Sequence, residues 1–196
     1  IDRHKTDPNS ADTDADGLND GDEINTHKTN PKLADTDQDG LNDNDEIDLK
    51  TNPSEVDTDK DGLGDGDEIR IIGTNPLAQD SDRDGIIDGD EDSDSDSLSD
   101  AVELYTHHTD PKVADSDKDG LSDGDEVIHG TQPLKADSNG NSISDGNEDT
   151  DSDGLSDADE FNIHYTNPKV ADTDQDGLSD GDEVALHNTN PAKADT

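Results

Sequence analysis

The chain has 196 residues, of which 23% are hydrophobic and 2% aromatic, and its 56 acidic and 13 basic side chains give a formal net charge of −43. So few apolar side chains exclude a conventional hydrophobic core, because their burial cannot offset a conformational entropy cost of roughly 1.5 kcal/mol per residue. The charge excludes nucleic acid as a partner and favours cations, and the absence of cysteine excludes disulfides and thiolate metal sites.

A 12-residue pattern, D-x-D-x-D-G-[LI]-x-D-x-D-E, recurs along the chain. Seven segments match it in full: 12–23, 35–46, 57–68, 80–91, 115–126, 149–160 and 172–183. Two further segments depart from it, because 92–103 carries Ser97 in place of the glycine and 137–148 carries Asn139, Asn141 and Ser142 at positions 3, 5 and 6. The sequence therefore contains nine loops of one internal plan.

The loops follow one another in a fixed rhythm. Spacers of 10 or 11 residues separate most of them and contain the motif Thr-[Asn/Asp/Gln]-Pro, whereas 80–91 is fused directly to 92–103 and 137–148 to 149–160. Residues 1–12 align without gaps on 24–35, and Asp195 begins another loop. We expect residues 1–196 to be one continuous array, cut from a longer repeat region that has flanking modules.

The spacing of oxygen ligands in each loop predicts a calcium site. Carboxylates at positions 1, 3, 5 and 9, the backbone carbonyl of position 7 and a bidentate Glu at position 12 supply the six to eight oxygens that Ca²⁺ prefers. Glycine at position 6 permits the sharp turn, whereas Mg²⁺ demands a tighter octahedron and zinc prefers nitrogen or sulfur. We predict about nine bound Ca²⁺ ions whose uptake is coupled to folding.

The predicted ligands are, loop by loop, Asp12, Asp14, Asp16, Leu18, Asp20 and Glu23; Asp35, Asp37, Asp39, Leu41, Asp43 and Glu46; Asp57, Asp59, Asp61, Leu63, Asp65 and Glu68; Asp80, Asp82, Asp84, Ile86, Asp88 and Glu91; Asp92, Asp94, Asp96, Leu98, Asp100 and Glu103; Asp115, Asp117, Asp119, Leu121, Asp123 and Glu126; Asp137, Asn139, Asn141, Ile143, Asp145 and Glu148; Asp149, Asp151, Asp153, Leu155, Asp157 and Glu160; and Asp172, Asp174, Asp176, Leu178, Asp180 and Glu183. The neutral oxygens of Asn139 and Asn141 predict that loop 137–148 is the weakest site. Ser97 is expected to strain the turn of its loop.

Position 11 is acidic in seven loops and allows two interpretations. Its members are Asp22, Asp45, Asp67, Asp90, Asp125, Asp159 and Asp182. They are either solvated acids near the start of a short helix, where the helix dipole favours them, or bridges to a second ion or to the neighbouring loop. In the second case the chain binds more than nine ions.

Short helices are expected after position 9 of each loop. A segment such as 20–27 has room for about two turns before Thr-Asn-Pro, because proline disfavours helix in the residue that precedes it. The few apolar residues recur at positions 7 and 13, so we expect them to pack one loop against the next as a thin local core.

Histidines recur late in the spacers, at His4, His27, His107, His164 and His187, with His108 and His129 nearby. A place near a helix C-terminus suits a side chain that can be cationic. Zinc at His107 and His108 is the alternative.

The loops resemble thrombospondin type 3 repeats, and more closely the cysteine-free bacterial form of that repeat, over essentially the whole chain. The aliphatic residue at position 7 (for example Leu18) separates them from EF-hands, which usually carry theirs at position 8, and the fused pairs leave no room for flanking helices. The resemblance implies a mostly irregular, calcium-stabilised repeat array, elongated and solenoid-like, in an extracellular or surface protein. It does not imply an enzyme, and no nucleophile motif is present.

The difference between extracellular and cytosolic calcium concentrations predicts where the protein is located. With dissociation constants of ~10⁻⁵ to 10⁻⁴ M, millimolar calcium contributes roughly 1.5 to 3 kcal/mol per site, and submicromolar cytosolic calcium almost nothing. We therefore expect an extracellular or cell-surface protein of bacterial or archaeal origin, without direct membrane insertion because no apolar run is long enough. The predicted function is a calcium-rigidified stalk, spacer or fibre segment. The alternative is a calcium-dependent adhesion module that binds carbohydrate, another partner or copies of itself.

Overall fold

The computed structural model describes residues 6–194, which divide into two compact units between Glu91 and Asp92. The boundary falls between the fused loops 80–91 and 92–103. The predicted start of a further loop at Asp195, and His4, lie outside the described residues.

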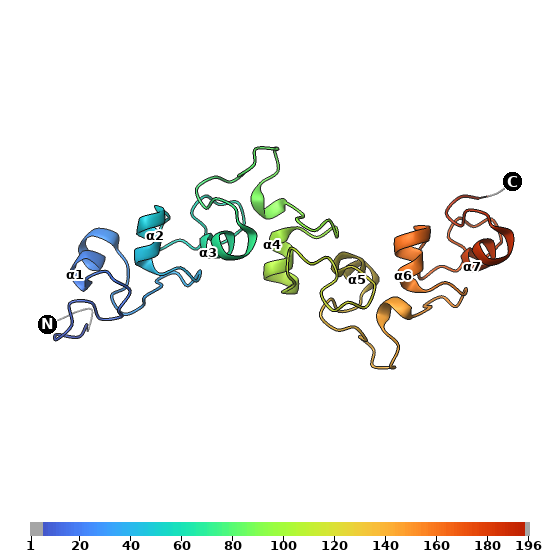
Figure 1. The fold of residues 1–196 in the computed structure, drawn as a ribbon, viewed down its shortest axis with the longest axis horizontal. Coiled ribbons are helices and arrows are strands. Elements are labelled where there is room, and N and C mark those ends of the chain that lie inside the picture. Colours follow the sequence, from blue (N-terminus) through green and yellow to red (C-terminus); the bar gives the residue numbers. More distant parts are fainter. Residues whose placement is uncertain (1–5, 195–196) are drawn as a thin grey trace. The chain divides into compact units, whose positions relative to one another are not determined.

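The first unit contains three short α-helices joined by irregular chain (Figure 1). Helix α1 (Asp20–Asp22) continues into the π-helical turn η1 (Glu23–His27), α2 spans Asp43–Leu49, and α3 (Asp65–Asp67) continues into η2 (Glu68–Ile72). The fused loop 80–91 ends in a single 3₁₀ turn, η3 (Asp88–Asp90). Each helix begins at position 9 of its loop, as predicted.

The second unit repeats this plan with four α-helices, and residues 6–194 contain no β-strand. The helices and helical turns are α4 (Asp100–Val102) with η4 (Glu103–His107), α5 (Asp123–His129), the 3₁₀ turn η5 (Asp145–Asn147), α6 (Asp157–Asp159) with η6 (Glu160–His164), and α7 (Asp180–Asp182) with η7 (Glu183–His187). Both loops that lack a spacer, 80–91 and 137–148, therefore end in a 3₁₀ turn, because the next loop starts before a longer helix can form.

Local chemistry sets the ends of these helices. Position 8 has extended backbone, and the Asn42 side chain accepts a hydrogen bond from the Asp45 N–H, which caps α2. Each longer helix closes on a residue with left-handed backbone, such as Lys50 (φ 74°), and the Thr51 N–H then donates to the Glu46 carbonyl at 3.0 Å. The proline motif follows and prevents continuation.

The interior of each unit is acidic rather than apolar. Among residues 6–194, the buried hydrophobic side chains are Leu41, Leu63 and Leu121, all at position 7. The prediction that positions 7 and 13 pack one loop against the next is therefore only partly right, since Ile86 and Ile143 at position 7 and Ile69 and Val127 at position 13 are exposed. By contrast, the position-12 glutamates of seven loops are fully buried: Glu23, Glu46, Glu68, Glu103, Glu126, Glu160 and Glu183.

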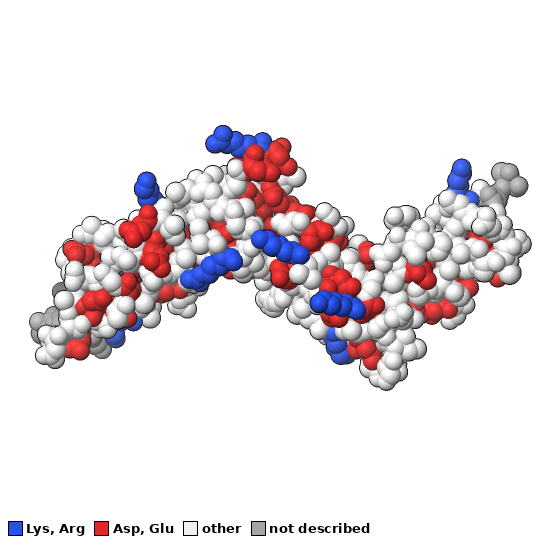
Figure 2. Space-filling view, in the orientation of Figure 1, with Lys and Arg blue, Asp and Glu red and all other residues white. Residues whose placement is uncertain are grey.

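Many other acidic side chains lie at the surface. Figure 2 shows acidic groups on the visible face of both units and a few separate basic groups. Within residues 6–194, every helix is too short and too polar to cross a membrane. The molecule thus combines a highly charged exterior with buried carboxylates, and those buried groups define the candidate site.

Candidate metal sites

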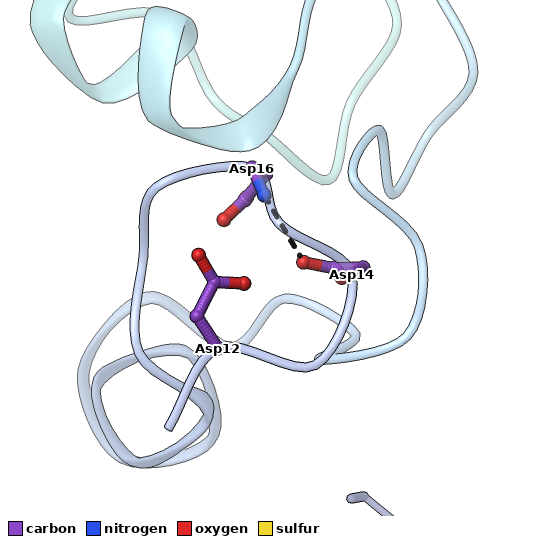
Figure 3. Close-up of side chains that lie close together, drawn as sticks. All are labelled: Asp12, Asp14 and Asp16. Carbon is purple, nitrogen blue, oxygen red and sulfur yellow. Dashed lines mark hydrogen bonds between the residues drawn. The ribbon is translucent and has the colours of Figure 1, made fainter. Parts of the chain in front are cut away.

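The first three aspartates of a loop converge on its interior. Figure 3 shows this for Asp12, Asp14 and Asp16, which offer carboxylate oxygens that all lie within 4.8 Å of one another. The corresponding aspartates of loops 35–46 and 57–68 form equivalent groups. The structure thus brings positions 1, 3 and 5 together, as the ligand spacing predicts.

Backbone hydrogen bonds hold these carboxylates in place. Asp12 accepts from the N–H groups of Ala15 (2.7 Å) and Gly17 (3.2 Å). Oδ1 of Asp14 accepts from the Asp16 N–H at 3.4 Å, and Oδ1 of Asp16 accepts from the Leu18 N–H at 2.7 Å. The second oxygens of Asp14 and Asp16 are buried and have no hydrogen-bond partner. Oxygens fixed and left unpaired in this way suit a hard cation.

The position-12 glutamates are the buried acidic groups that most clearly lack a compensating positive charge. Glu46 is fully buried, and neither of its carboxylate oxygens has a hydrogen-bond partner. Burial, followed by the charges of Asp37 and Asp39, raises the pKa of Glu46 to about 8. An ionised carboxylate in such a place is costly unless a positive charge compensates it, so the residues present fit a bound divalent ion.

The same perturbation recurs along the chain. Burial and neighbouring aspartates raise the pKa of Glu23 to about 7 and those of Glu68, Glu103, Glu126 and Glu160 to about 8. At position 3, burial and the adjacent aspartates raise the pKa of Asp37, Asp94 and Asp117 to about 6.

These shifts predict how the calcium-free chain responds to pH. A glutamate with a usual pKa of 4.5 and a folded pKa of about 8 binds more protons in the folded than in the unfolded chain between those values. The folded form is therefore stabilised at low pH and loses that stability as pH rises through about 8. We expect chelated protein to gain helical circular dichroism when pH is lowered from about 8 to about 5. Saturating calcium should abolish this gain, and a chelated chain that loses structure on acidification would contradict the assignment.

Position 9 has a local partner that sequence analysis missed. Both oxygens of Asp20 accept hydrogen bonds from Thr13 at position 2, Oδ1 from the backbone N–H (2.8 Å) and Oδ2 from the hydroxyl (2.9 Å). The signal was present in the sequence, because position 2 is Thr or Ser in every loop: Thr13, Thr36, Thr58, Ser81, Ser93, Ser116, Ser138, Thr150 and Thr173. Hydrogen bonds from position 2 thus hold Asp20 and its equivalents against the start of their own loop.

Position 11 lies outside the groups formed by positions 1, 3 and 5. Asp22, Asp45, Asp90, Asp159 and Asp182 are exposed, and Asp67 and Asp125 are half-buried. Their places at the start of short helices favour the interpretation as solvated acids near the positive end of the helix dipole.

Serine replaces the turn glycine in two loops. The position-6 glycines have φ between 100° and 106°, whereas Ser97 has φ 82° and Ser142 has φ 77°. The turn thus stays left-handed but moves toward the part of that region that side chains tolerate, at a cost of roughly 1 kcal/mol.

Loop 137–148 fills its interior differently. As in the other loops, the side-chain Oδ1 atoms of Asn139 and Asn141 accept hydrogen bonds from backbone N–H groups, of Asn141 (3.0 Å) and Ile143 (2.8 Å). Their amide nitrogens therefore point inward, where an aspartate would offer an oxygen, and both donate to Glu148 Oε1 at 2.7 Å. Two amide N–H groups thus satisfy Glu148 Oε1 in this loop, and the low calcium affinity of the loop stays a prediction.

The double substitution Asn139→Asp and Asn141→Asp should create a strong site in this loop. It replaces two inward donors by ligand oxygens and frees Glu148, so we expect native mass spectrometry at limiting calcium to count one more bound ion. Asn147→Asp adds charge at exposed position 11 of the same loop and serves as the control. An equal gain in the control would show that added charge alone explains the result.

Histidines lie at helix C-termini, as predicted: His27, His107, His164 and His187 each end a π-helical turn. His108 Nδ1 lies 2.9 Å from the Leu104 carbonyl oxygen. His129 is different, because its Nε2 lies 3.2 Å from Oδ2 of the fully buried Asp157 and its ring packs edge-on against Phe161. Burial raises the pKa of Asp157, but hydrogen bonds from His129 and Thr150 outweigh it, so the net shift is downward.

Comparisons with known sequences and solved structures give few matches. No curated protein sequence matches the chain. Two solved structures are similar over short segments: the B domain of a biofilm-associated protein (40% identity over 24% of this chain, TM-score 0.24) and the BSP domain of a biofilm-associated protein (43% over 22%, TM-score 0.22). The chain spans 12% and 8% of those two proteins.

The family comparison covers most of the sequence. The bacterial TSP3 repeat matches residues 12–34, 35–54, 57–79, 92–114, 115–136, 149–171 and 172–194. The loops outside these matches, 80–91 and 137–148, are the two that lack their own spacer. The acidic loops, their buried carboxylates and this match over most of the chain agree, and the chain belongs to the bacterial TSP3 repeat family.

Proposed function

We propose that this chain is a calcium-binding structural segment of a surface or secreted protein, a stalk or spacer that calcium makes rigid. The observation that carries the proposal is the set of fully buried position-12 glutamates with unpartnered oxygens. In a chain with so few buried hydrophobic side chains, these groups oppose folding until cations neutralise them. Ion binding then supplies stability that an apolar core supplies elsewhere.

Calcium is the cation that the ligand set favours. The groups offer only oxygen, from three aspartates and a glutamate per loop, and calcium accepts six to eight such ligands in a flexible geometry. We propose about one ion for each loop with an all-acidic ligand set. Millimolar calcium outside cells would fill sites that cytosolic calcium leaves empty, which supports an extracellular location.

Small-angle scattering with and without chelator tests the stalk. A compact globule of this length has a radius of gyration near ~16 Å and an unfolded chain one near ~47 Å. We expect an extended particle of defined length in calcium, and the broad distribution of a flexible chain in chelator. Identical scattering in both conditions would contradict the proposal.

A binding module is the second candidate, supported by one cavity. In the second unit an open pocket of about 550 Å³ is lined by Phe161, Tyr165, Asn162 and Asp125, among others. Tyr165 is 79% exposed, and an accessible aromatic ring beside polar groups suits a carbohydrate or a peptide. A glycan array compared between the wild type and Tyr165→Ala tests this candidate, and filament formation is tested by electron microscopy in calcium.

A further inference from the structure

Consecutive loops interlock through the glycine at position 10. Its N–H donates to the second carboxylate oxygen of the position-5 aspartate in a preceding loop. The pairs are Gly66 with Asp39 (2.9 Å), Gly124 with Asp96 (2.9 Å), Gly146 with Asp119 (3.0 Å) and Gly181 with Asp153 (2.7 Å). Each of these glycines lies so close that an added Cβ would fall 2.0–2.6 Å from the backbone oxygen of its partner aspartate. Each junction therefore brings the adjacent position 9 to the preceding loop.

The position-9 aspartate lies close to two predicted ligands of that preceding loop. Asp43 offers an oxygen within 4.8 Å of those offered by Asp16 and Glu23, which belong to loop 12–23. One loop further on, Asp65 forms the same group with Asp39 and Glu46. In both groups position 9 of one loop joins positions 5 and 12 of the loop before it.

Three of the four carboxylate oxygens of the glutamates in these groups have no hydrogen-bond partner, and the fourth, Oε1 of Glu23, accepts a hydrogen bond from the Thr29 hydroxyl (3.3 Å). Glu46 is fully buried with both carboxylate oxygens unpartnered, and Glu23 is fully buried with Oε2 unpartnered. Asp43 is also fully buried, and its oxygens accept the Thr36 N–H (2.8 Å) and hydroxyl (2.7 Å). Each carboxylate oxygen has a second lone pair, so Asp43 can bind a cation while Thr36 holds it in place.

We propose that the position-9 aspartate completes the divalent-cation site of the preceding loop rather than that of its own loop. The inference rests on the proposed function, because it assigns a ligand to the same calcium sites. It makes each ion a link between two loops, so that binding at one loop orders the next. The position-2 Thr or Ser is then a positioning residue that holds the aspartate toward its neighbour.

At other junctions the charge of the position-9 aspartate also reaches an earlier loop, in addition to the glutamate of its own loop, as Asp123 reaches Glu126. The charge of Asp88 acts on Asp59 and Asp61, that of Asp123 on Asp94 and Asp96, and that of Asp180 on Asp151. In each pair the first residue is at position 9 and its neighbours are at positions 3 or 5 of an earlier loop.

Asp157 offers a natural comparison within the second unit. It follows the fused loop 137–148, and its Oδ2 faces His129 at 3.2 Å. At this junction a side chain that is positive when protonated stands beside the position-9 carboxylate. The buried Asp157 thus has a partner that can carry positive charge.

The variant Asp43→Asn separates the two assignments of position 9. The Gly17 N–H reports on loop 12–23 and the Gly40 N–H on loop 35–46, because each donates to the position-1 carboxylate of its own loop. We expect calcium titrations followed by NMR to show about tenfold weaker binding at Gly17 in the variant and unchanged binding at Gly40. The reverse result would overturn the inference and leave calcium binding itself intact.

Asp45→Asn is the matched control, because it removes the same charge from an exposed site on the same helix, α2. It should leave both glycines unchanged. If neither glycine of the wild type responds to calcium, the proposed function fails, and this inference with it. A crystal structure of the wild type in calcium needs no variant: an ion within ~2.6 Å of Asp43 and Glu23 supports the inference, and an ion bound by Glu23 but out of reach of Asp43 overturns it.

Discussion

Chelation of calcium is expected to unfold most of this chain. The position-12 glutamates are fully buried without hydrogen-bond partners for one or both oxygens, and without cations they must either take up protons or move into water. At pH 8 proton uptake by the glutamates is incomplete and the ionised aspartates around them repel one another, so the loops lose their order. With roughly 1.5 to 3 kcal/mol contributed per site, loss of all the ions should exceed the stability of an ordinary domain.

Hydrogen exchange gives a test that is resolved by loop. In calcium, the N–H groups of position 6 should be protected, because each donates to the position-1 carboxylate, as Gly62 does to Asp57 (3.1 Å). In chelator we expect this protection to disappear in the all-acidic loops. Ser142 should lose least, because the Asn139 and Asn141 amides still satisfy Glu148. Uniform protection with and without calcium would contradict the assignment of the cations as the stabilising element.

Substitution of a junction glycine should have the second-largest effect. In Gly124→Ala, the new methyl group would lie 2.0 Å from the backbone oxygen of Asp96. Because that oxygen belongs to the backbone of a neighbouring loop, relief of the clash must separate the two loops and break the Gly124 N–H bond to Asp96 (2.9 Å). We expect a loss of about 3 kcal/mol in calcium-saturated urea unfolding.

Gly21→Ala provides the matched control. Gly21 holds the same position 10 in loop 12–23, but an added Cβ there meets nothing within 4 Å. Since Gly21 lies in helix α1, alanine should leave stability unchanged or raise it by up to about 1 kcal/mol. Equal losses in both variants would show that glycine is needed at position 10 for a local reason and not for the junction.

The natural sequence shows how larger residues are accepted at position 10. Asn44 occupies position 10 of loop 35–46, and its side chain lies 3.4 Å from where a Cβ atom on Gly17 would be. Ala158 occupies position 10 of loop 149–160, and its Cβ lies 3.7 Å from where a Cβ atom on Gly120 would be. Gly17 and Gly120 are the position-6 glycines of earlier loops. The larger residue at position 10 thus packs against a glycine, which keeps the neighbouring loops close.

The sequence alone determined the local plan of this protein. The spacing of Asp12, Asp14 and Asp16 predicted their convergence, and proline motifs predicted where helices such as η1 end, because both depend on a few adjacent residues. The acidic composition likewise predicted that no conventional core would form, and Leu41, Leu63 and Leu121 are the buried hydrophobic side chains of residues 6–194.

Only the tertiary structure decided which loop each position-9 aspartate faces. Within one loop, Asp43 looks like a ligand for its own ion, yet Thr36 clamps it and the Asp16 and Glu23 of the previous loop approach it. The inward amides of Asn139 and Asn141 also became visible only there, because backbone hydrogen bonds fix which side-chain atom faces the interior. The physical reason is the same in both cases: contacts between loops depend on the path of the chain between them, which local spacing does not encode.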